Sequence, residues 1–375
     1  MNLTPTSEQL LIIDSATSFL EKQSDMKAVR NISENSDGFD QDLWDQMNEL
    51  GWCNLLLPDD IGGMGMGYVE MCLLQEKLGQ YLTCSPFFDS SVLSTIVLLS
   101  HSDKKSSAET LSDLSEGKAI VSFALPHLNK SSKNQVKKSA TGWLLNGQWS
   151  HIGSLPSADK VLLTAKDEQG QEHLFLIDAS STGFNSVEQK TLDLTQRNGC
   201  LFAENANLPE TAHLAMMNAP DYLQRDLCFA SIGLAAEQVG IAQKALDLTL
   251  KYVGERSQFG KTISGFQAVK HRCAQMSVEL ESSRSAVYGA ACMADTKPSN
   301  DTLLFYGAQA FVEATKAAIY CTEESIQLHG GMGFTWEFDL HRLLKRAQYN
   351  SQRLLPISWW QEKVAALLLD QEISL

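Results

Sequence analysis

The hydrophobic pattern of this 375-residue chain changes its period twice, and this constrains the fold more than any single motif. In residues 1–117, apolar side chains recur every three or four positions, for example at Leu10, Ile13 and Leu20, and again at Leu43. This spacing is typical of amphipathic helices. We therefore expect an all-helical N-terminal domain over residues 1–117.

Between residues 118 and 215 the apolar runs are short and separated by turn signals. AIVSFAL, GWLLNGQW, KVLLTAK and HLFLID each have the length of one strand, and Asn146-Gly147 favours a tight turn. The lysine-bearing stretch LNKSSKNQVKKSATG predicts a solvated hairpin loop, with a binding patch as the alternative. The sequence thus predicts a small middle β domain, a β-barrel or β-sandwich, over residues 118–215.

Long helical periods return after Pro220. They cover residues 222–253, 266–296, 301–329 and 356–370. Glycines inside these periods, such as Gly240, favour close approach between neighbouring helices. Residues 218–375 are therefore predicted to form a C-terminal four-helix bundle, and the fold class is α+β in the order helical, β, helical.

Composition narrows the range of partners. The formal charge of -15 repels nucleic-acid phosphates and anionic lipid surfaces over most of the molecule, so we expect neither nucleic acid nor membrane as a partner. A few converging cations can still bind an anionic ligand in a pocket, because distant surface charge is screened.

Cysteine usage and the N-terminus predict a cytoplasmic protein. The eight cysteines are far apart, and none forms a CxxC pair or a zinc-like spacing with histidine, so we expect buried thiols in a reducing compartment and no metal site. The first residues lack a basic segment before their apolar ones, and no apolar run approaches the roughly 20 residues of a membrane span.

Residues 255–276, ERSQFGKTISGFQAVKHRCAQM, interrupt two long helical periods. An arginine at such a break, Arg256, is suited to a bidentate pair with a diphosphate. Phe259 is suited to cover an aromatic ring, and Gln267 to anchor a sugar or phosphate. Composition alone favours an ordinary helix–turn–helix with a surface arginine over a binding site.

Residues 324–337, ESIQLHGGMGFTWE, carry three glycines directly after a helical period, at Gly330, Gly331 and Gly333. Glycines leave backbone N–H groups uncovered, which suits a phosphate or the close approach of a planar cofactor. A helix C-cap accounts for one glycine but poorly for three. Binding loop and plain turn both stay open for this stretch.

Together the two stretches resemble the C-terminal signature of acyl-CoA dehydrogenases. R-x-Q-F-G-x-x-I-x-x-F-Q-x-x-K-H is followed about 60 residues later by Q-x-H-G-G-x-G-F, and ELGWCNLLLPDDIGGMGMG and QEKLGQYLTCSPF are similar to that family's first domain. The resemblance covers nearly the whole chain and implies FAD as cofactor. It also implies that six residues contact the adenosine diphosphate half of FAD: Arg256, Phe259, Gln267, Gln327, Gly330 and Gly331. In the family this FAD belongs to the neighbouring subunit, so an oligomer, a dimer or a tetramer, is implied.

The same resemblance exposes a missing catalytic group. Desaturation of an acyl thioester needs a carboxylate to remove the α proton while the flavin accepts the β hydride. The family's usual position for it is Leu354 here, and the alternative position on the first long C-terminal helix is Ala230. Asp226, one helical turn before Ala230, is the candidate base within this chain, and a solvated helix acid is its alternative reading.

The β domain departs from the family as well. SHIGS stands where the family has a W-I-T segment that braces the flavin ring, so that His151 and Gly153 replace Trp and Thr, and FALPHLN replaces a Thr-Glu-Pro turn. His151 is conceivable as a base, but a solvent-facing or packed histidine is the simpler interpretation. The loss of a stacking aromatic and a hydroxyl donor should weaken this chain's hold on its own flavin.

The resemblance thus points to the base-less subunit of a heteromeric acyl-CoA dehydrogenase, a type that includes enzymes acting on steroid side-chain thioesters, and it implies a role in fatty acid or steroid side-chain catabolism. The implied substrate is an acyl-CoA thioester, and the implied electron acceptor is an electron-transfer flavoprotein. Two alternatives stay open: a self-sufficient dehydrogenase with a displaced base, and a non-catalytic binding or scaffold protein that kept the fold and lost flavin.

Overall fold

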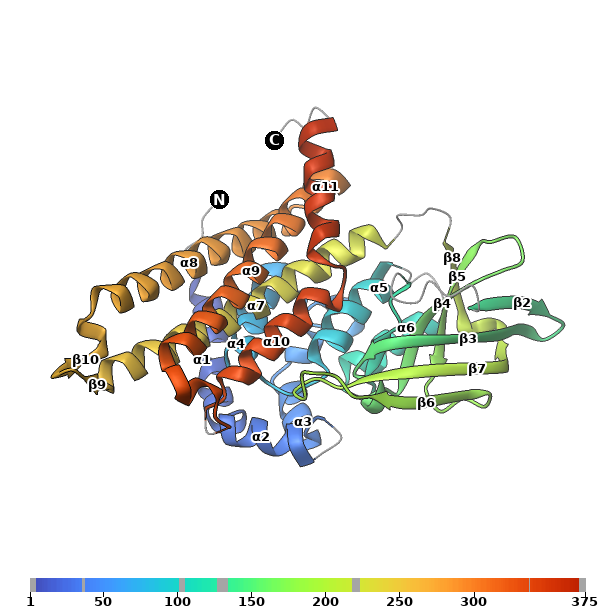
Figure 1. Ribbon diagram of the computed structural model, residues 1–375. Coiled ribbons are helices and arrows are strands. Elements are labelled where there is room, and N and C mark those ends of the chain that lie inside the picture. Colours follow the sequence, from blue (N-terminus) through green and yellow to red (C-terminus); the bar gives the residue numbers. More distant parts are fainter. Residues whose placement is uncertain are drawn as a thin grey trace. The chain divides into compact units, whose positions relative to one another are not determined.

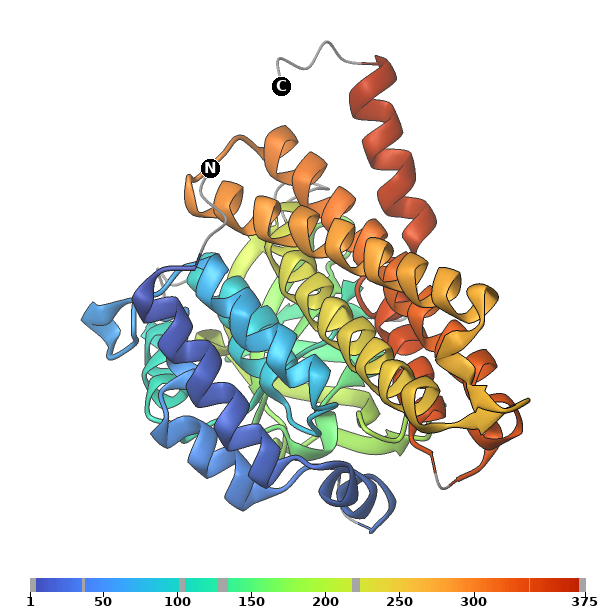
Figure 2. The same cartoon turned by 90° about the vertical axis from the view of Figure 1, so that its left-hand side faces the viewer.

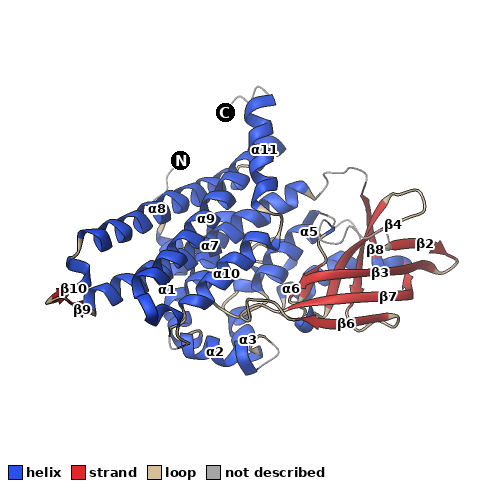
Figure 3. Cartoon of the chain, viewed as in Figure 1, coloured by secondary structure: helices blue, strands red, loops and turns tan. Residues whose placement is uncertain are grey.

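A computed structural model describes residues 5–35, 38–100, 105–126, 134–217, 223–336 and 338–370. The chain forms two compact units. Unit 1 comprises Met1–Arg30, Tyr68–Thr83 and Ser231–Leu375, and unit 2 comprises Asn31–Gly67 and Cys84–Ala230. Helices precede and follow the strands along the chain, which confirms the predicted order (Figures 1 and 3). The bounds of the three predicted domains follow secondary structure rather than spatial contact and stay a prediction.

Unit 1 is helical apart from one short hairpin. Its helices are α1 (Ser7–Gln23), α4 (Tyr68–Gln80), α8 (Gln267–Asp295), α9 (Asn300–His329), α10 (Leu340–Arg353) and α11 (Ile357–Asp370), with most of α7 (Gln224–Glu255). Helices α7, α8 and α9 lie side by side in both views (Figures 1 and 2). The predicted spans of these three helices and of α11 are confirmed to within two residues.

Close approach between α4 and α7 depends on glycine. A Cβ atom placed on Gly240 would lie 1.9 Å from the backbone oxygen of Glu76, and one on Gly79 would lie 2.2 Å from that of Glu237. Neither helix can therefore carry a side chain at its contact point, because backbone atoms cannot yield. The expected role of Gly240 in helix packing is confirmed.

Helix α10 was not expected from the sequence. Its buried face carries Arg342, Arg346 and Asn350 where apolar residues normally mark a helix, so the hydrophobic period is hidden. The guanidinium Nη1 of Arg346 lies 2.8 Å from Oε1 of Glu237 on α7, and both side chains are buried. Because each charge has its partner, a polar face can pack in the interior.

Unit 2 contains an eight-stranded mixed sheet and several helices. The strands are β1 (Val121–Phe123), β2 (Gln135–Ser139), β3 (Gly142–Gly153), β4 (Lys160–Lys166), β5 (Glu172–Asp178), β6 (Phe184–Gln189), β7 (Asn198–Pro209) and β8 (His213–Met217). They are ordered β6-β7-β3-β2-β4-β5-β8, with β1 paired to β4. The helices are α3 (Gln41–Glu49), the π-helix η3 (Phe88–Ser94), α5 (Thr95–Ser100) and α6 (Lys105–Ser115), while α2 (Met26–Asn35) runs from unit 1 into unit 2.

The strands alternate inward and outward side chains around one apolar core. Trp149, Leu163 and Phe175 are fully buried in it, and the indole Nε1 of Trp149 donates to the backbone oxygen of Thr164 at 2.9 Å. The predicted β domain is confirmed.

The predicted hairpin loop over residues 128–142 is wrong in its second half. Residues 135–139 form strand β2, in which Lys137 pairs with Glu168 and Lys138 with Glu210. Residues 128–133 lie outside the described part. Both lysines therefore have acidic partners, as expected of a solvated surface rather than of an anion-binding patch.

All eight cysteines are free thiols, and each is buried except Cys292, which is half-buried. No helix in the described part of the chain combines the length and the apolar character needed to cross a bilayer.

Candidate cofactor and substrate site

Arg256 directly follows α7 and opens a hairpin that the sequence did not predict. Strands β9 (Ser257–Gln258) and β10 (Lys261–Thr262) pair antiparallel, and the two residues between them, Phe259 and Gly260, both have positive φ, at 54° and 78°. Two central residues of positive φ make a tight primed hairpin turn. The expected helix break is confirmed, but a hairpin replaces the simple turn.

Phe259 combines a disfavoured backbone conformation with an exposed aromatic side chain. Its left-handed backbone is disfavoured for a residue with a Cβ, and its side chain is 91% exposed. The ring meets Phe266 edge-on at a centroid distance of 6.2 Å. The hairpin turn accounts for the left-handed backbone, whereas nothing in the packing of the described residues accounts for the exposed ring, which fits a residue that contacts a molecule outside the chain.

The side chains of Arg256 and Gln267 are likewise left open. Both are exposed, and within the described residues no carboxylate pairs with the guanidinium of Arg256. Gln267 is the first residue of α8, whose N-cap, Phe266, supplies no side-chain hydrogen bond. The first N–H groups of a 29-residue helix thus carry a partial positive charge toward solvent, which suits an anion.

Glycine stands at each of the three positions after α9 for a different physical reason. Gly330 has φ 59° and ψ -139°, a conformation that essentially only glycine adopts. A Cβ on Gly333 would lie 2.6 Å from the backbone oxygen of Ile326, so its role is packing. Gly331 has neither constraint, because a Cβ there would meet no atom within 4 Å. Its bare backbone fits close approach by a ligand better than a plain turn.

Tyr252 and His329 join the two stretches, and sequence reasoning missed both. Their rings stack at 4.2 Å with an interplanar angle of 23°, and the Tyr252 hydroxyl donates to the backbone oxygen of His329 at 3.3 Å. Burial lowers the pKa of His329, although a hydrogen bond with the backbone oxygen of Ser325 opposes the shift, and the net shift favours the neutral ring. Tyr252 lies one turn before Arg256 and His329 directly precedes Gly330, so the stack brings the two binding stretches to one end of unit 1. The sequence signal that could have predicted this contact is an aromatic residue next to each motif, Tyr252 before the first and His329 within the second.

Two further exposed aromatics lie at this end of unit 1, which we call the hairpin end (residues 252–267 and 327–336; Figures 1 and 2). Phe334 is 82% exposed and Trp336 is 70% exposed. Gln327, on the last turn of α9, is also exposed. All six predicted FAD contacts thus lie at the hairpin end, none of them is buried, and an exposed aromatic group of this size is typical of a covered interface.

Neither usual base position can serve as a base. Leu354 caps α10 and Ala230 lies on α7, and both are fully buried and apolar. No acidic residue occurs between Asp339 and Glu362. The absence of the usual carboxylate is therefore a property of the folded chain as well as of its sequence.

Asp226 is a buried carboxyl rather than a solvated helix acid. It is 3% exposed on α7 in unit 2, and its Oδ1 accepts a hydrogen bond from Ser100 Oγ at 2.6 Å. Oδ2 is buried and has no hydrogen-bond partner among the described residues. Burial raises the pKa of Asp226 to about 7, although Ser100 and Arg225 oppose the shift. A carboxyl that titrates near neutral pH has the acidity that a general base needs.

The segment SHIGS, to which the resemblance assigns the bracing of the flavin ring, has an irregular backbone. Strands β3 and β7 change register between Trp149 and Ile152, and His151 and Ser154 have φ values of 57° and 56°. His151 is exposed, and its backbone N–H donates to Oε1 of Gln189 at 2.7 Å. The solvent-facing interpretation of His151 therefore holds. Of FALPHLN, residues 127–129 lie outside the described part.

Asp89 fills the space that a side chain at position 153 would need. A Cβ on Gly153 would lie 2.5 Å from Oδ1 and 2.6 Å from Oδ2 of Asp89, which projects from η3. The hydroxyl of Ser154 donates to Asp89 Oδ2 at 2.6 Å, and that of Ser122 donates to the backbone oxygen of Gly153 at 2.8 Å. The buried Asp89 side chain thus occupies the space beside position 153, where the family resemblance implies a threonine. Sequence reasoning missed Asp89, although an acid within the apolar stretch PFFDSSVL was a visible signal.

Comparisons with known proteins identify similar sequences and folds over nearly the whole chain. Residues 6–118 match the acyl-CoA dehydrogenase N-terminal domain, and residues 221–352 match the acyl-CoA dehydrogenase C-terminal domain. The chain is 31% identical over 356 residues to acyl-CoA dehydrogenase IpdE2 of Mycobacterium tuberculosis, covering 94% of each protein. It is 26% identical over 352 residues to the caffeyl-CoA reductase-Etf complex subunit CarC of Acetobacterium woodii, covering 88% of this chain and 90% of that protein.

Among solved structures, one chain of the ChsE4-ChsE5 complex from Mycobacterium tuberculosis superposes on this chain with a TM-score of 0.88 at 22% identity. The match covers 100% of this chain and 100% of that chain. At this identity the likeness concerns the fold. The chain belongs to the acyl-CoA dehydrogenase family. Its fold is that of the family: a helical N-terminal part, a β-sheet middle domain and a C-terminal helical domain.

Proposed function

We propose that this chain is a subunit of an FAD-dependent acyl-CoA dehydrogenase that desaturates an acyl-CoA thioester between Cα and Cβ, and that it completes the FAD site of a non-identical partner. One observation carries the proposal. The side chains at the hairpin end, which would serve a neighbour's cofactor, are exposed, whereas Asp89 fills the space beside Gly153, which by the family resemblance would lie next to this chain's own flavin ring.

The residues at the hairpin end fit the diphosphate and adenosine of FAD. Arg256 would pair with the diphosphate as a fork of two N–H donors, and Phe259 would lie over an aromatic ring. Gln267 and the N-terminus of α8 would bind sugar or phosphate oxygens, and the backbone of Gly331 would allow close approach. When bound, FAD supplies the acceptor for the hydride from Cβ.

The proton at Cα needs a base that this chain lacks at both usual positions. Leu354 and Ala230 can exclude water from a thioester but cannot accept a proton. In our proposal the carboxylate comes from the partner chain, so that each complete site draws its base and its cofactor contacts from different subunits.

Relatives support this assembly. IpdE2 is named an acyl-CoA dehydrogenase, ChsE4 and ChsE5 form a complex, and CarC belongs to an Etf complex. By analogy we assign a fatty-acyl or steroid side-chain thioester as the substrate class and an electron-transfer flavoprotein as the acceptor.

A second candidate is a self-sufficient dehydrogenase in which Asp226 is the base. Its buried carboxyl with a pKa of about 7 and a free Oδ2 favours this alternative. Against it stands Asp89, because a fixed carboxylate beside the ring position leaves no room for the family's hydroxyl donor. A flavin-free scaffold protein is the third alternative, and the strained, exposed Phe259 weighs against it.

Anaerobic titration with acyl-CoA separates these three. The chain is purified alone and after co-expression with a homologue that carries glutamate at the position equivalent to Leu354, and flavin absorbance is followed. We expect bleaching in the mixed assembly and none with the chain alone. Bleaching by the chain alone, lost in Asp226→Asn, would establish the self-sufficient enzyme. No flavin absorbance in any sample, with FAD added, would establish the scaffold.

A further inference from the structure

A half-open cavity of about 530 Å³ lies inside unit 1, between helices α1, α4 and α8. Helix α4 packs against both other helices. The volume of the cavity is in the range of small-molecule sites, roughly 300–1,000 Å³. None of the residues that we assign to FAD or to the thioester lines it, so the cavity is a separate candidate site.

Helices α4 and α8 run antiparallel along this cavity. The backbone N–H of Tyr68, the first residue of α4, donates to Oδ1 of Asp295, the last residue of α8, at 2.7 Å. Further along α4, Oε2 of Glu76 accepts from the hydroxyl of Tyr288 on α8 at 2.8 Å. The start of α4 therefore lies beside the end of α8, and the last turns of α4 lie beside the middle of α8.

The end of the cavity beside the start of α4 is mainly apolar. Val69 and Leu73 are four residues apart, so they lie on one face of α4, and Cys292 of α8 also lines the cavity. Thr6 and Gln9 of α1 are the polar lining residues here, and they hydrogen-bond to each other in the capping box of that helix. This end suits an aliphatic chain.

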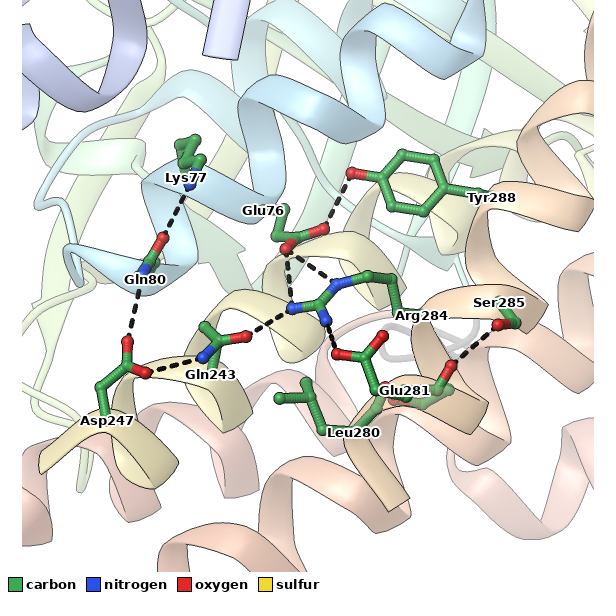
Figure 4. Close-up of polar contacts among 11 residues, drawn as sticks. Glu76, Lys77, Gln80, Gln243, Asp247, Leu280, Glu281, Arg284, Ser285 and Tyr288 are labelled. Carbon is green, nitrogen blue, oxygen red and sulfur yellow. Dashed lines mark hydrogen bonds and ion pairs between the residues drawn. The ribbon is translucent and has the colours of Figure 1, made fainter. Parts of the chain in front are cut away.

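The other end of the cavity is built from a network of hydrogen bonds and ion pairs (Figure 4). Oε1 of Glu76 accepts from Nε of Arg284 at 3.2 Å. Arg284 also donates to Oε1 of Gln243 at 2.7 Å and to the carboxylate of Glu281. The Ser285 hydroxyl donates to the backbone oxygen of Glu281 at 2.9 Å. Two carboxylates thus share one guanidinium, which leaves an excess negative charge in this network.

Lys77 and Glu281, both at the polar end, keep hydrogen-bonding capacity of opposite kinds. The Lys77 ammonium donates to Oε1 of the neutral Gln80 amide at 3.1 Å and pairs with no carboxylate among the described residues, so its charge and its remaining N–H donors stay available. The Glu281 carboxylate is 62% exposed and has lone pairs beyond the one that Arg284 uses. A ligand of one sign leaves one of these two groups without a partner, whereas a zwitterion matches both.

We propose that this cavity is a second ligand site that binds an apolar α-amino acid as a zwitterion. The carboxylate of the ligand pairs with Lys77 and its ammonium group with Glu281, while its side chain lies against Val69 and Leu73. The site is separate from the proposed FAD site and does not depend on the proposed function.

Isothermal titration calorimetry of the full chain with three related probes tests the ligand class. L-norleucine carries both charged groups, pentylamine lacks the carboxylate, and hexanoate lacks the ammonium group. We expect saturable binding of norleucine, about tenfold or more tighter than either singly charged probe, because each of these gives up one charge-assisted hydrogen bond. A singly charged probe that binds as tightly as norleucine, or no saturable binding of norleucine, would overturn the proposal.

Two variants place the binding in this cavity. Lys77→Met removes the cation and should weaken norleucine about tenfold without weakening pentylamine. Glu281→Gln removes the anion and should weaken norleucine about tenfold without weakening hexanoate. Lys270→Met on α8 and Glu323→Gln on α9 are matched controls, exposed and outside the lining, and should bind norleucine like the natural protein. Unaltered norleucine binding in either Lys77→Met or Glu281→Gln contradicts the proposal.

Discussion

The hairpin end of unit 1 and the segment around Gly153 in unit 2 are the two stretches that the family resemblance relates to FAD, yet they differ in what fills the space beside them. At the hairpin end Phe259 is 91% exposed, and a Cβ on Gly331 would meet nothing within 4 Å. In contrast, a Cβ on Gly153 would lie 2.5 Å from Oδ1 of Asp89.

The difference teaches how such a site can be divided between chains. A strained, exposed aromatic costs stability and is expected to persist where something outside the chain uses it. The buried Asp89 carboxyl next to Gly153 instead indicates that this space no longer accommodates the side chain that the family has at this position. We therefore interpret the hairpin end as a surface that still binds a cofactor and the Gly153 segment as one that has lost this role.

Charge reversal at the hairpin end should have the largest effect. Arg256→Glu would face a diphosphate with a carboxylate, and like charges in contact cost several kcal/mol, so we expect FAD affinity of the mixed assembly to fall on the order of 1,000-fold or more. Fluorescence titration with FAD measures it. Lys251→Ala, exposed on α7 but outside the hairpin end, is the matched control and should bind FAD normally. Unaltered affinity in Arg256→Glu would remove the hairpin end from the cofactor site.

The second-largest expected effect is a dependence of the free energy of unfolding on pH, caused by the titration of Asp226. Burial raises its pKa to about 7, against about 3.9 in an unfolded chain. The folded state therefore holds a proton that the unfolded state releases, so this contribution is complete below about pH 4 and is lost as pH rises to about 7, by about 4 kcal/mol. Urea unfolding at several pH values should show a shallower decline in Asp226→Asn, whereas the exposed Asp42→Asn should behave like the natural protein. Identical slopes in Asp226→Asn and the natural protein would mean that Asp226 is not buried as a neutral acid.

The Gly153 segment offers a smaller, coupled effect. Gly153→Thr forces a side chain onto the Asp89 carboxyl and should cost about 2 kcal/mol of unfolding free energy, as overpacking usually does. In an Asp89→Ala background the same substitution finds space, so the cost should shrink by about 1 kcal/mol or more. A double-mutant cycle by chemical denaturation tests it. Additive costs would show that Asp89 does not fill this position.

Gly331 and Gly333 form the mildest test. Gly331→Ala adds a methyl group into open space, so the melting temperature should stay unchanged while FAD affinity falls about tenfold through lost close approach. Gly333→Ala should lower the melting temperature instead, because its Cβ meets Ile326 at 2.6 Å. Equal melting temperatures for the two variants would contradict the separate roles assigned to them.

How far the sequence predicts this molecule depends on the range of the interactions involved. Helices α7, α8 and α9 follow from their hydrophobic period, and the two glycine-bearing stretches follow from local residue types. Helix α10 could not be predicted in this way, because Arg346 is buried by an ion pair with Glu237, more than 100 positions away in the chain.

The same limit applies to the site. Arg256 and Gly331 belong to motifs that are visible as short strings, so their role could be predicted from the sequence alone. Asp89 and Gly153 are 64 positions apart and only the fold reveals that one fills the space of the other. The strained φ of Phe259 is also invisible in sequence, since phenylalanine rarely adopts it and no pattern announces it.

The FAD-to-protein ratio tests the central claim most directly. Native mass spectrometry, with flavin absorbance as a check, is applied to the purified chain and to its co-expressed assembly with the glutamate-bearing homologue. Our account predicts no retained FAD on the chain alone and one FAD per pair of unlike chains in the assembly. One FAD per copy of this chain, retained without any partner and bleached by acyl-CoA, would contradict it.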